Sequence, residues 1–291
     1  MSIKTTVITG ATSGIGKETA LALAKKDHTL YLLVRNTIKG DELKQEIITK
    51  TGNKNIHVIK CDLSDLQSVR EAAAELNNGK LFAINVLINN AGGMFDKKEL
   101  SKDGFEMTFA TNHLGHFLLT TSILPLLEKG HARIINVSSE AHKMGKANFD
   151  DLQWGQRPYS AIKAYGEAKL FNIYFTKTLA EKYADKGISS FAVHPGVVRT
   201  GFGAESSGLS KFLLWIAKPF MISPEEGAQT SIFLATEPGM EAKSCQYFIK
   251  SKMAKSSVLA WSEANRNTLW DISKKLVGKS AAAGEDTSKK S

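Results

Sequence analysis

The chain has 291 residues, of which 42% are apolar and 23% charged, and its formal net charge at pH 7 is +9. This length and apolar content suffice for one large globular domain, which argues against a disordered or fibrous chain. The lysines are scattered in pairs such as Lys25-Lys26 and Lys97-Lys98, without a basic helix or an interleaved aromatic platform. The positive charge therefore does not predict nucleic-acid binding.

Two cysteines, Cys61 and Cys245, have neither metal-ligand spacing nor the pattern of a disulfide framework, so reduced structural thiols and no metal site are predicted. The N-terminus leads directly into a strand pattern rather than a charged and apolar leader, and no apolar stretch is long enough to span a bilayer. These features predict a cytoplasmic protein without a transmembrane segment.

Short β-branched or apolar runs alternate with longer amphipathic segments along the chain. The predicted strands are 5–9, 29–34, 56–60, 86–89, 133–137, 189–194 and 246–249. This alternation is typical of a parallel sheet covered by helices on both faces, so we predict an α/β, Rossmann-like, doubly wound sheet of about seven strands. One domain spans 1–278. The segment 279–291 lacks apolar periodicity and predicts a disordered tail.

The first predicted strand runs directly into a glycine-rich turn, residues 10–16, which reads Gly-Ala-Thr-Ser-Gly-Ile-Gly, and a helical pattern follows over 17–26. Glycines at a strand-to-helix turn allow close backbone approach, and the unpaired amides of the helix end attract a pyrophosphate. The spacing G-x-x-x-G-x-G departs from the general dinucleotide fingerprint G-x-G-x-x-G and is a weak signal by itself.

A tyrosine and a lysine, Tyr165 and Lys169, lie four residues apart in a segment with a helical apolar pattern. On a helix this spacing is a rise of about 6 Å and nearly one full turn, so both side chains share a face. A fixed ammonium group near a phenol can lower the phenol pKa enough for acid/base catalysis near neutral pH. The pair Tyr159 and Lys163 has the same spacing, but Tyr159 follows Pro158 near the expected helix start.

Further motifs occur in a fixed order along the chain. They are Thr9-Gly10-Ala11-Thr12-Ser13-Gly14-Ile15-Gly16, Asn89-Asn90-Ala91-Gly92, Asn112-His113-Leu114-Gly115-His116-Phe117, Val137-Ser138-Ser139 and Pro195-Gly196-Val197-Val198-Arg199-Thr200. With Tyr165 and Lys169 they resemble the short-chain dehydrogenase/reductase family over about residues 1 to 278. The segments 138–142 and 192–198 are similar to those of retinol-dehydrogenase-like members.

The resemblance implies a role for each catalytic side chain. Tyr165 would donate and accept the proton, Lys169 would lower the Tyr165 pKa and bind the nicotinamide ribose, and Asn112 would hold a water in a proton relay. Ser139 would bind the substrate oxygen. We choose Ser139 over Ser138 because the family's serine is the second of this pair, although adjacent residues at a strand end point in opposite directions.

The end of the second strand bears on the choice of cofactor. NAD enzymes usually present a carboxylate there, whereas this chain has Arg35, whose planar charged group suits a 2′-phosphate. NADP(H) is therefore predicted over NAD(H). Asp62 resembles the family's adenine-contacting aspartate, and the alternative is that Asp62 or Ser64 caps the helix starting near Asp65. The expected cofactor-binding residues are Gly10, Thr12, Ser13, Gly14, Ile15, Gly16, Arg35, Asp62, Leu63, Asn90, Ala91, Gly92, Tyr165, Lys169, Pro195, Gly196, Val198 and Thr200.

An apolar region over 202–221 predicts a substrate lid spanning about 199–223 and a lipophilic alcohol or carbonyl substrate. Core packing, a dimer contact or superficial binding to a membrane surface are alternative uses of the same residues. The resemblance also makes a homo-oligomer an expectation, formed through the helices that carry Asn112 and Tyr165.

Three functions compete at this point. The first is an NADP-dependent oxidoreductase that interconverts a hydrophobic alcohol and its aldehyde or ketone without a metal. The second is a dinucleotide-binding regulatory or scaffold protein without catalysis, against which the intact set Asn112, Ser139, Tyr165 and Lys169 argues. The third is a sugar-nucleotide epimerase, whose usual G-x-x-G-x-x-G motif and larger C-terminal region are not seen here.

Overall fold

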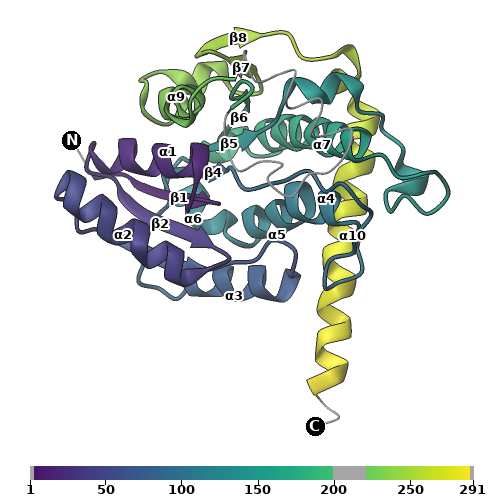
Figure 1. Ribbon diagram of the computed structural model, residues 1–291, viewed down its shortest axis with the longest axis horizontal. Coiled ribbons are helices and arrows are strands. Elements are labelled where there is room, and N and C mark those ends of the chain that lie inside the picture. Colours follow the sequence, from purple (N-terminus) through teal and green to yellow (C-terminus); the bar gives the residue numbers. More distant parts are fainter. Residues whose placement is uncertain (1–2, 199–220, 289–291) are drawn as a thin grey trace.

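One eight-stranded sheet forms the centre of the protein (Figure 1). The computed structural model describes residues 3–198 and 221–288, with side chains described through residue 278. The sheet order is β3-β2-β1-β4-β5-β6-β7-β8. The strands are β1 Thr5–Thr9, β2 Thr29–Val34, β3 Ile56–Lys60, β4 Val86–Asn89, β5 Arg133–Val137, β6 Ser189–His194, β7 Tyr247–Ile249 and β8 Lys252–Ala254. The first seven pair in parallel, which confirms the predicted α/β doubly wound fold.

Helices cover both faces of the sheet and create two hydrophobic layers. The helices are α1 Gly14–Ala24, α2 Thr37–Thr51, α3 Leu66–Leu76, α4 Met107–Phe109, α5 Gly115–Ser122, α6 Leu124–Lys129, α7 Ala161–Lys182, α9 Pro224–Thr236 and α10 Glu263–Ser288. Short turns of other helix types are η1 Ala110–Leu114, η2 Glu140–Met144, η3 Phe149–Asp151, η4 Ala184–Lys186, η6 Met240–Lys243 and η7 Val258–Trp261. Helices α1, α2 and α9 pack on one face, and α3, α5, α7 and α10 on the other.

The strand order changes direction at β1, which pairs with β2 on one side and β4 on the other. In open parallel sheets this switch point opens a crevice beyond the carboxyl ends of the strands, where ligands bind. The glycine-rich turn after β1 and the sequence Asn90-Ala91-Gly92 after β4 both lie at this place. The topology thus brings distant motifs together.

The eighth strand was not predicted from the sequence. β8 pairs antiparallel with β7 in a hairpin, with Ile249 opposite Lys252. The two turn residues, Lys250 and Ser251, have φ angles of 50° and 59°. A two-residue hairpin turn needs this left-handed conformation, which usually selects Asn or Gly. Because neither occurs here, the turn carries no strong sequence signal.

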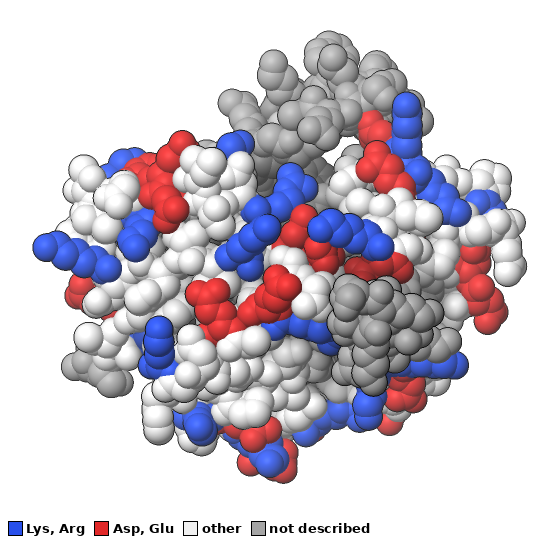
Figure 2. All heavy atoms as spheres, turned by 90° about the horizontal axis from the view of Figure 1, so that it is seen from below, with Lys and Arg blue, Asp and Glu red and all other residues white. Residues whose placement is uncertain are grey.

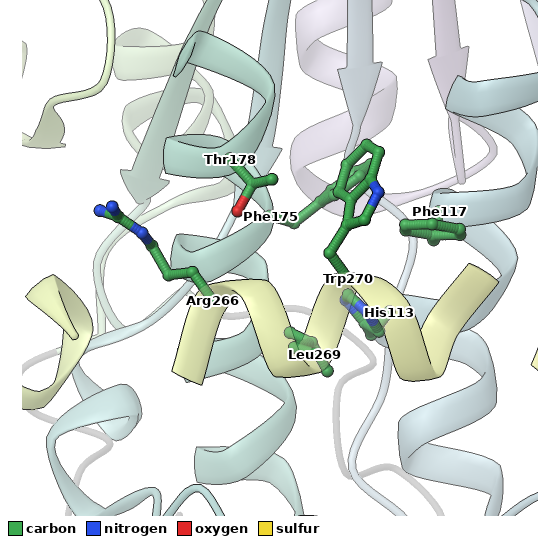
Figure 3. Close-up of a pocket in the computed structure, with 7 residues that line it drawn as sticks. All are labelled: His113, Phe117, Phe175, Thr178, Arg266, Leu269 and Trp270. Atoms are coloured by element: carbon green, nitrogen blue, oxygen red, sulfur yellow. The ribbon is translucent and has the colours of Figure 1, made fainter. Parts of the chain in front are cut away.

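The C-terminal helix α10 runs to Ser288 and so continues through most of the segment 279–291 for which the sequence predicts a disordered tail. Three consecutive alanines at 281–283 have high helix propensity and extend a helix already anchored upstream. The anchor is visible in Figure 3, where residues of α10 face α7 and α5. The space between these helices has no room even for a water molecule, so it is not a ligand site. Its lining is His113, Phe117, Phe175, Thr178, Arg266, Leu269 and Trp270.

Most of the predicted lid, residues 199–220, lies outside the described residues. The chain is described again from Met221, where Ile222 forms a parallel bridge with Val198. Ser223 then begins α9 with a capping box, in which its side chain and that of Glu226 each accept a backbone N–H. Among the described helices, we find none that combines the length and the apolar character needed to cross a bilayer.

Candidate active site

The turn between β1 and α1 can be built only with glycines at two positions. Gly10 has φ +66°, and a Cβ atom there would lie 2.9 Å from Cα of Ala91. A Cβ on Gly16 would lie 2.3 Å from the carbonyl oxygen of Gly10. These close approaches keep the turn flat against the end of β4.

The first turn of α1 has the properties of an anion site. Ser13 is the N-cap residue, its side chain makes no capping hydrogen bond, and the first turn contains no acidic residue. The first amide groups of a helix have no partner within the helix, and the helix dipole is positive at this end. These properties suit the pyrophosphate group of a dinucleotide, for which the sequence predicts a site at residues 10–16.

Asn90 braces this turn from the neighbouring strand. Its Nδ2 donates to the carbonyl oxygens of Thr9 at 3.0 Å and Gly10 at 3.1 Å. The Thr9 hydroxyl in turn accepts the backbone N–H groups of Asn90 and Ala91, each at 3.0 Å. Asn90 thus fixes the shape of the wall that the cofactor would contact.

Arg35 directly follows β2 and is exposed. The next residue, Asn36, caps α2 by accepting the backbone N–H of Lys39 at 3.1 Å. The first turn of α2 contains no acidic residue. The end of β2 is therefore bordered by positive charge and by a helix N-terminus.

Asp62 and Leu63 follow β3. The Asp62 carboxylate accepts the backbone N–H and the hydroxyl of Ser64 at 3.0 and 2.7 Å. The N-cap of α3 is Asp65, so the alternative that Asp62 or Ser64 caps this helix is wrong. The Leu63 side chain is buried in the core, and its carbonyl oxygen packs against Gly115. Only the backbone of Leu63 is left to contact a cofactor.

The loop after β6, beginning Pro195-Gly196, lies beside the first turn of α1. Gly196 has φ +99°, and a Cβ there would lie 2.6 Å from the Ile222 side chain. A Cβ atom on Gly227 would lie 2.6 Å from the Val198 side chain and 3.2 Å from the Ile15 side chain. Val198 and Ile15, both predicted to bind the cofactor, therefore lie close to each other across Gly227. Thr200 lies outside the described residues.

Helix α7 brings Tyr165 and Lys169 to the carboxyl end of β5. The Lys169 ammonium nitrogen lies 5.2 Å from the centroid of the Tyr165 ring and donates to the carbonyl oxygen of Val137 at 3.1 Å. A side-chain hydrogen bond joins Tyr165 to Ser139. Ser138 points the other way and donates to the carbonyl oxygen of Lys169 at 2.7 Å. The structure therefore joins Ser139, Tyr165 and Lys169 in one cluster and leaves Ser138 in a structural contact.

Burial dominates the electrostatics of this pair. It raises the pKa of Tyr165, and the Ser139 hydrogen bond opposes that shift. It lowers the pKa of Lys169 to about 7. Removal from water disfavours the charged form of both groups, which is a stronger effect here than the attraction the sequence predicted between them. Burial thus brings the pKa of Lys169 close to neutral pH.

Asn112 lies within the π-helical turn η1 between α4 and α5. Its Nδ2 donates to the carbonyl oxygens of Gly93 at 2.8 Å and Thr108 at 2.9 Å, while the buried Oδ1 has no hydrogen-bond partner among the described residues. A Cβ on Gly92 would lie 2.3 Å from this oxygen and 3.3 Å from Lys169 Nζ. Gly92 therefore leaves the Asn112 Oδ1 acceptor and the Lys169 amine facing one small space.

The competing pair Tyr159 and Lys163 has a different setting. Tyr159 precedes α7, and its hydroxyl donates to the carbonyl oxygen of Phe95 at 2.9 Å and lies 3.2 Å from the Glu106 carboxylate. Lys163 is exposed. Tyr159 and Lys163 therefore do not share a helix face, unlike Tyr165 and Lys169.

Sequence reasoning gave no role to Glu167, which lies between Tyr165 and Lys169. Its buried carboxylate accepts two hydrogen bonds from Arg157, at 2.8 and 2.7 Å, and Arg157 also pairs with Asp151 at 3.3 Å. This bidentate contact fixes the first turns of α7 against the segment before it. Glu167 is two residues from both Tyr165 and Lys169, so it lies on the opposite side of the helix from them. A carboxylate within a largely apolar helical segment is the signal that suggests such an anchor.

Comparisons with known proteins identify the family. Residues 4–151 match a family model described as short chain dehydrogenase. The chain belongs to the short-chain dehydrogenase/reductase family. It is 42% identical to Retinol dehydrogenase 11 of Homo sapiens and 43% identical to Retinol dehydrogenase 12 of Mus musculus, in each case over 94% of this chain and 86% of the relative. This short-chain dehydrogenase/reductase is thus an oxidoreductase of the retinol-dehydrogenase-like type, which acts on CH–OH groups with a nicotinamide dinucleotide.

A solved structure agrees with this assignment. An uncharacterized protein from Mycobacterium Paratuberculosis has a TM-score of 0.76 and 31% sequence identity, with 94% of this chain and 93% of that chain covered. The likeness extends over both hydrophobic layers and is not confined to the glycine-rich half.

Proposed function

We propose that this short-chain dehydrogenase/reductase interconverts a hydrophobic alcohol and its aldehyde or ketone, with NADP(H) preferred over NAD(H) and Tyr165 as general acid/base. The observation that carries the proposal is the cluster in which Ser139 hydrogen-bonds Tyr165 and Lys169 lies 5.2 Å from the same ring. The nicotinamide, when bound, supplies or accepts the hydride. The residues of the chain orient the substrate oxygen and move its proton.

In the direction of reduction, the Ser139 and Tyr165 hydroxyls donate to the substrate carbonyl oxygen, and Tyr165 transfers its proton as negative charge develops there. Oxidation reverses the step, with Tyr165 as the base. Lys169 replaces the proton on Tyr165, and the acceptor Oδ1 of Asn112 holds a water that links Lys169 to solvent. The lowered pKa of Lys169, about 7, suits this relay.

Arg35 supports the preference for NADP(H). It is exposed at the end of β2, next to the N-terminus of α2, and that first turn has no acidic residue. A 2′-phosphate would meet a planar cation and a positive helix end there. The ribose hydroxyls of NAD(H) would find no carboxylate at this position.

The substrate class rests on the relatives and on the sequence. The two relatives compared above are named retinol dehydrogenases, and the region 202–221 of this chain is apolar. A long lipophilic alcohol or aldehyde, such as a retinoid, is the proposed substrate.

We also propose that the enzyme is cytoplasmic and makes superficial contact with a membrane surface through residues 202–221. A homo-oligomer would have to form beside α10, which covers Phe175 and Thr178 of α7 (Figure 3).

The test is NADPH oxidation with a panel of carbonyl compounds, from short aldehydes to retinal, beside the same panel with NADH. We expect turnover with lipophilic carbonyls and NADPH. Arg35→Ala should raise KM for NADPH by about tenfold while changing KM for NADH little, because only NADPH carries the 2′-phosphate. Tight NADPH binding without turnover of any carbonyl or alcohol would instead support the catalytically silent dinucleotide-binding protein.

A further inference from the structure

His142 in η2 is fully buried and makes a hydrogen bond with each ring nitrogen. Nδ1 lies 2.6 Å from the carbonyl oxygen of Ser139, and Nε2 lies 3.0 Å from the backbone nitrogen of Ser257. A backbone N–H can only donate, so Nε2 is the acceptor. The neutral ring therefore carries its hydrogen on Nδ1 and donates it to Ser139.

Hydrogen bonds from η2 hold both the carbonyl oxygen and the hydroxyl of Ser139. The Ser139 carbonyl oxygen also accepts the backbone N–H of His142 at 3.0 Å, and the Ser139 hydroxyl accepts the N–H of Ala141 at 3.2 Å. The same hydroxyl is hydrogen-bonded to Tyr165. The orientation of the serine that meets the catalytic phenol thus depends on contacts made by η2, among which the His142 ring supplies the shortest.

The His142 ring has little freedom to turn. The Tyr247 ring of β7 packs against it at an angle of 67° with a centroid distance of 5.1 Å. The Tyr247 hydroxyl donates to the Glu140 carboxylate at 3.1 Å, which ties the same side chain back to η2. His194 of β6 accepts the backbone N–H of Glu140 at 3.4 Å. Burial lowers the pKa of His142 and keeps the ring neutral at pH 7.

We propose that His142 is a positioning residue, which bridges the backbone of Ser257 to the carbonyl of Ser139 and thereby sets the direction of the Ser139 hydroxyl toward Tyr165. His142 does not touch the reacting atoms. The inference rests on the proposed acid/base role of Tyr165. Ser257 lies in the segment between β8 and η7, 115 residues after His142 in the sequence. By this proposal, that segment helps to align the serine that binds the substrate.

Three substitutions separate the two halves of the bridge. His142→Asn keeps a donor at the level of Nδ1, His142→Gln keeps an acceptor at the level of Nε2, and His142→Ala removes both. If the bond to Ser139 sets the alignment, Asn should keep kcat within about threefold, whereas Gln and Ala should lower it by about tenfold or more, since small misplacements of aligned groups have effects of this size. KM for NADPH should stay unchanged in all three.

His28→Ala is the matched control. His28 is also buried and has a bond from Nδ1, to the Thr6 hydroxyl at 2.7 Å, but it lies at the start of β2. We expect it to lower the melting temperature without changing kcat. Equal kcat losses for Asn, Gln and Ala, or a kcat of His142→Ala equal to that of the wild type, would overturn the proposal.

Hydrogen exchange of the backbone amides in 139–145 gives a readout that needs no turnover. Exchange should be faster in His142→Ala and His142→Gln than in the wild type, and close to wild type in His142→Asn. Unchanged exchange in His142→Ala would refute the positioning role even if no substrate were turned over. A wild-type enzyme that turns over no carbonyl, with exchange as expected, would refute the proposed function alone.

Discussion

Tyr165 and Tyr159 each precede a lysine by four residues, but their hydroxyls have different partners. Tyr165 bonds to Ser139 beside Lys169, whereas Tyr159 bonds to a backbone carbonyl and lies near the Glu106 carboxylate. We predict that Tyr165→Phe lowers kcat by about 10²-fold or more, because the proton donor is lost. Tyr159→Phe should keep most turnover and lower stability by about 1 kcal/mol. Steady-state kinetics and urea unfolding of both variants measure this, and the reverse ranking would move the acid/base role to Tyr159.

The pKa of Lys169 predicts the pH dependence of reduction. Its pKa in the folded protein is lowered to about 7, so the ammonium form, which makes Tyr165 a stronger acid, is present below pH 7 and is lost as pH rises through this value. We expect kcat/KM for carbonyl reduction to fall above about pH 7. In Lys169→Arg, which stays charged, the overall rate should be lower and this decline should be absent. A wild-type rate that rises between pH 7 and pH 8 would contradict the assignment.

The sequence predicted which residues of the candidate site lie close together, but not their pKa shifts. Ser139, Tyr165, Lys169 and Asn112 come together because each lies at a strand end or on an adjacent helix, which motif order is enough to predict. The direction of the Tyr165 pKa shift was not predictable, because it depends on how deeply packing removes the side chain from water. The contact of His142 with the backbone beyond β8 was equally hidden, since no local pattern links the two segments.

Close packing between elements depends on single glycines within helices. Gly115, the first residue of α5, has ordinary helical angles, and a Cβ there would lie 2.6 Å from the carbonyl oxygen of Leu63. Gly115→Ala should force α5 away from the loop after β3 and destabilise the fold by about 1–3 kcal/mol. Gly278→Ala in α10 is the control, because nothing lies within 4 Å of its Cβ position. It should stabilise the protein by about 0.5–1 kcal/mol through helix propensity, as urea unfolding would show. Equal effects of the two substitutions would rule out this contact.

At the level of elements, the strands with strong apolar runs were predictable and the irregular pieces were not. The first six strands have the predicted bounds. Strands β4, β5 and β6 are buried at every residue, and the edge strand β3 still buries Ile56 and Ile59. The hairpin between β7 and β8 turns at Lys250 and Ser251, which both have a left-handed backbone conformation. Lysine and serine rarely adopt this conformation, so the residue types do not predict the turn. The π-helical turn at Asn112 arises from side-chain bonds to Gly93 and Thr108, which only the tertiary structure supplies.

Over the whole molecule, the two core layers contain buried histidine side chains as well as apolar ones. His28 lies at the start of β2, and His113 and His116 lie in the η1–α5 region, all three buried. Burial lowers their pKa values to about 4, about 3 and about 4, respectively. His116 bonds to Thr9 at 2.9 Å, so one of these rings supports the strand that leads into the glycine-rich turn. Acid conditions should therefore weaken the fold and the cofactor site together.

The sign of this pH effect follows from the direction of the shifts. Each folded-state pKa is lower than the unfolded value of about 6.5, so the neutral rings stabilise the fold fully above pH 6.5, and that stabilisation is lost as the pH falls toward the folded-state values. Between pH 6.5 and pH 5 each histidine should contribute a loss of about 2 kcal/mol. His28→Asn removes one such group, so its unfolding free energy should fall about 2 kcal/mol less than that of the wild type over this interval. Urea unfolding at both pH values tests the difference, and identical pH slopes for the two proteins would show that His28 is not buried in the neutral form.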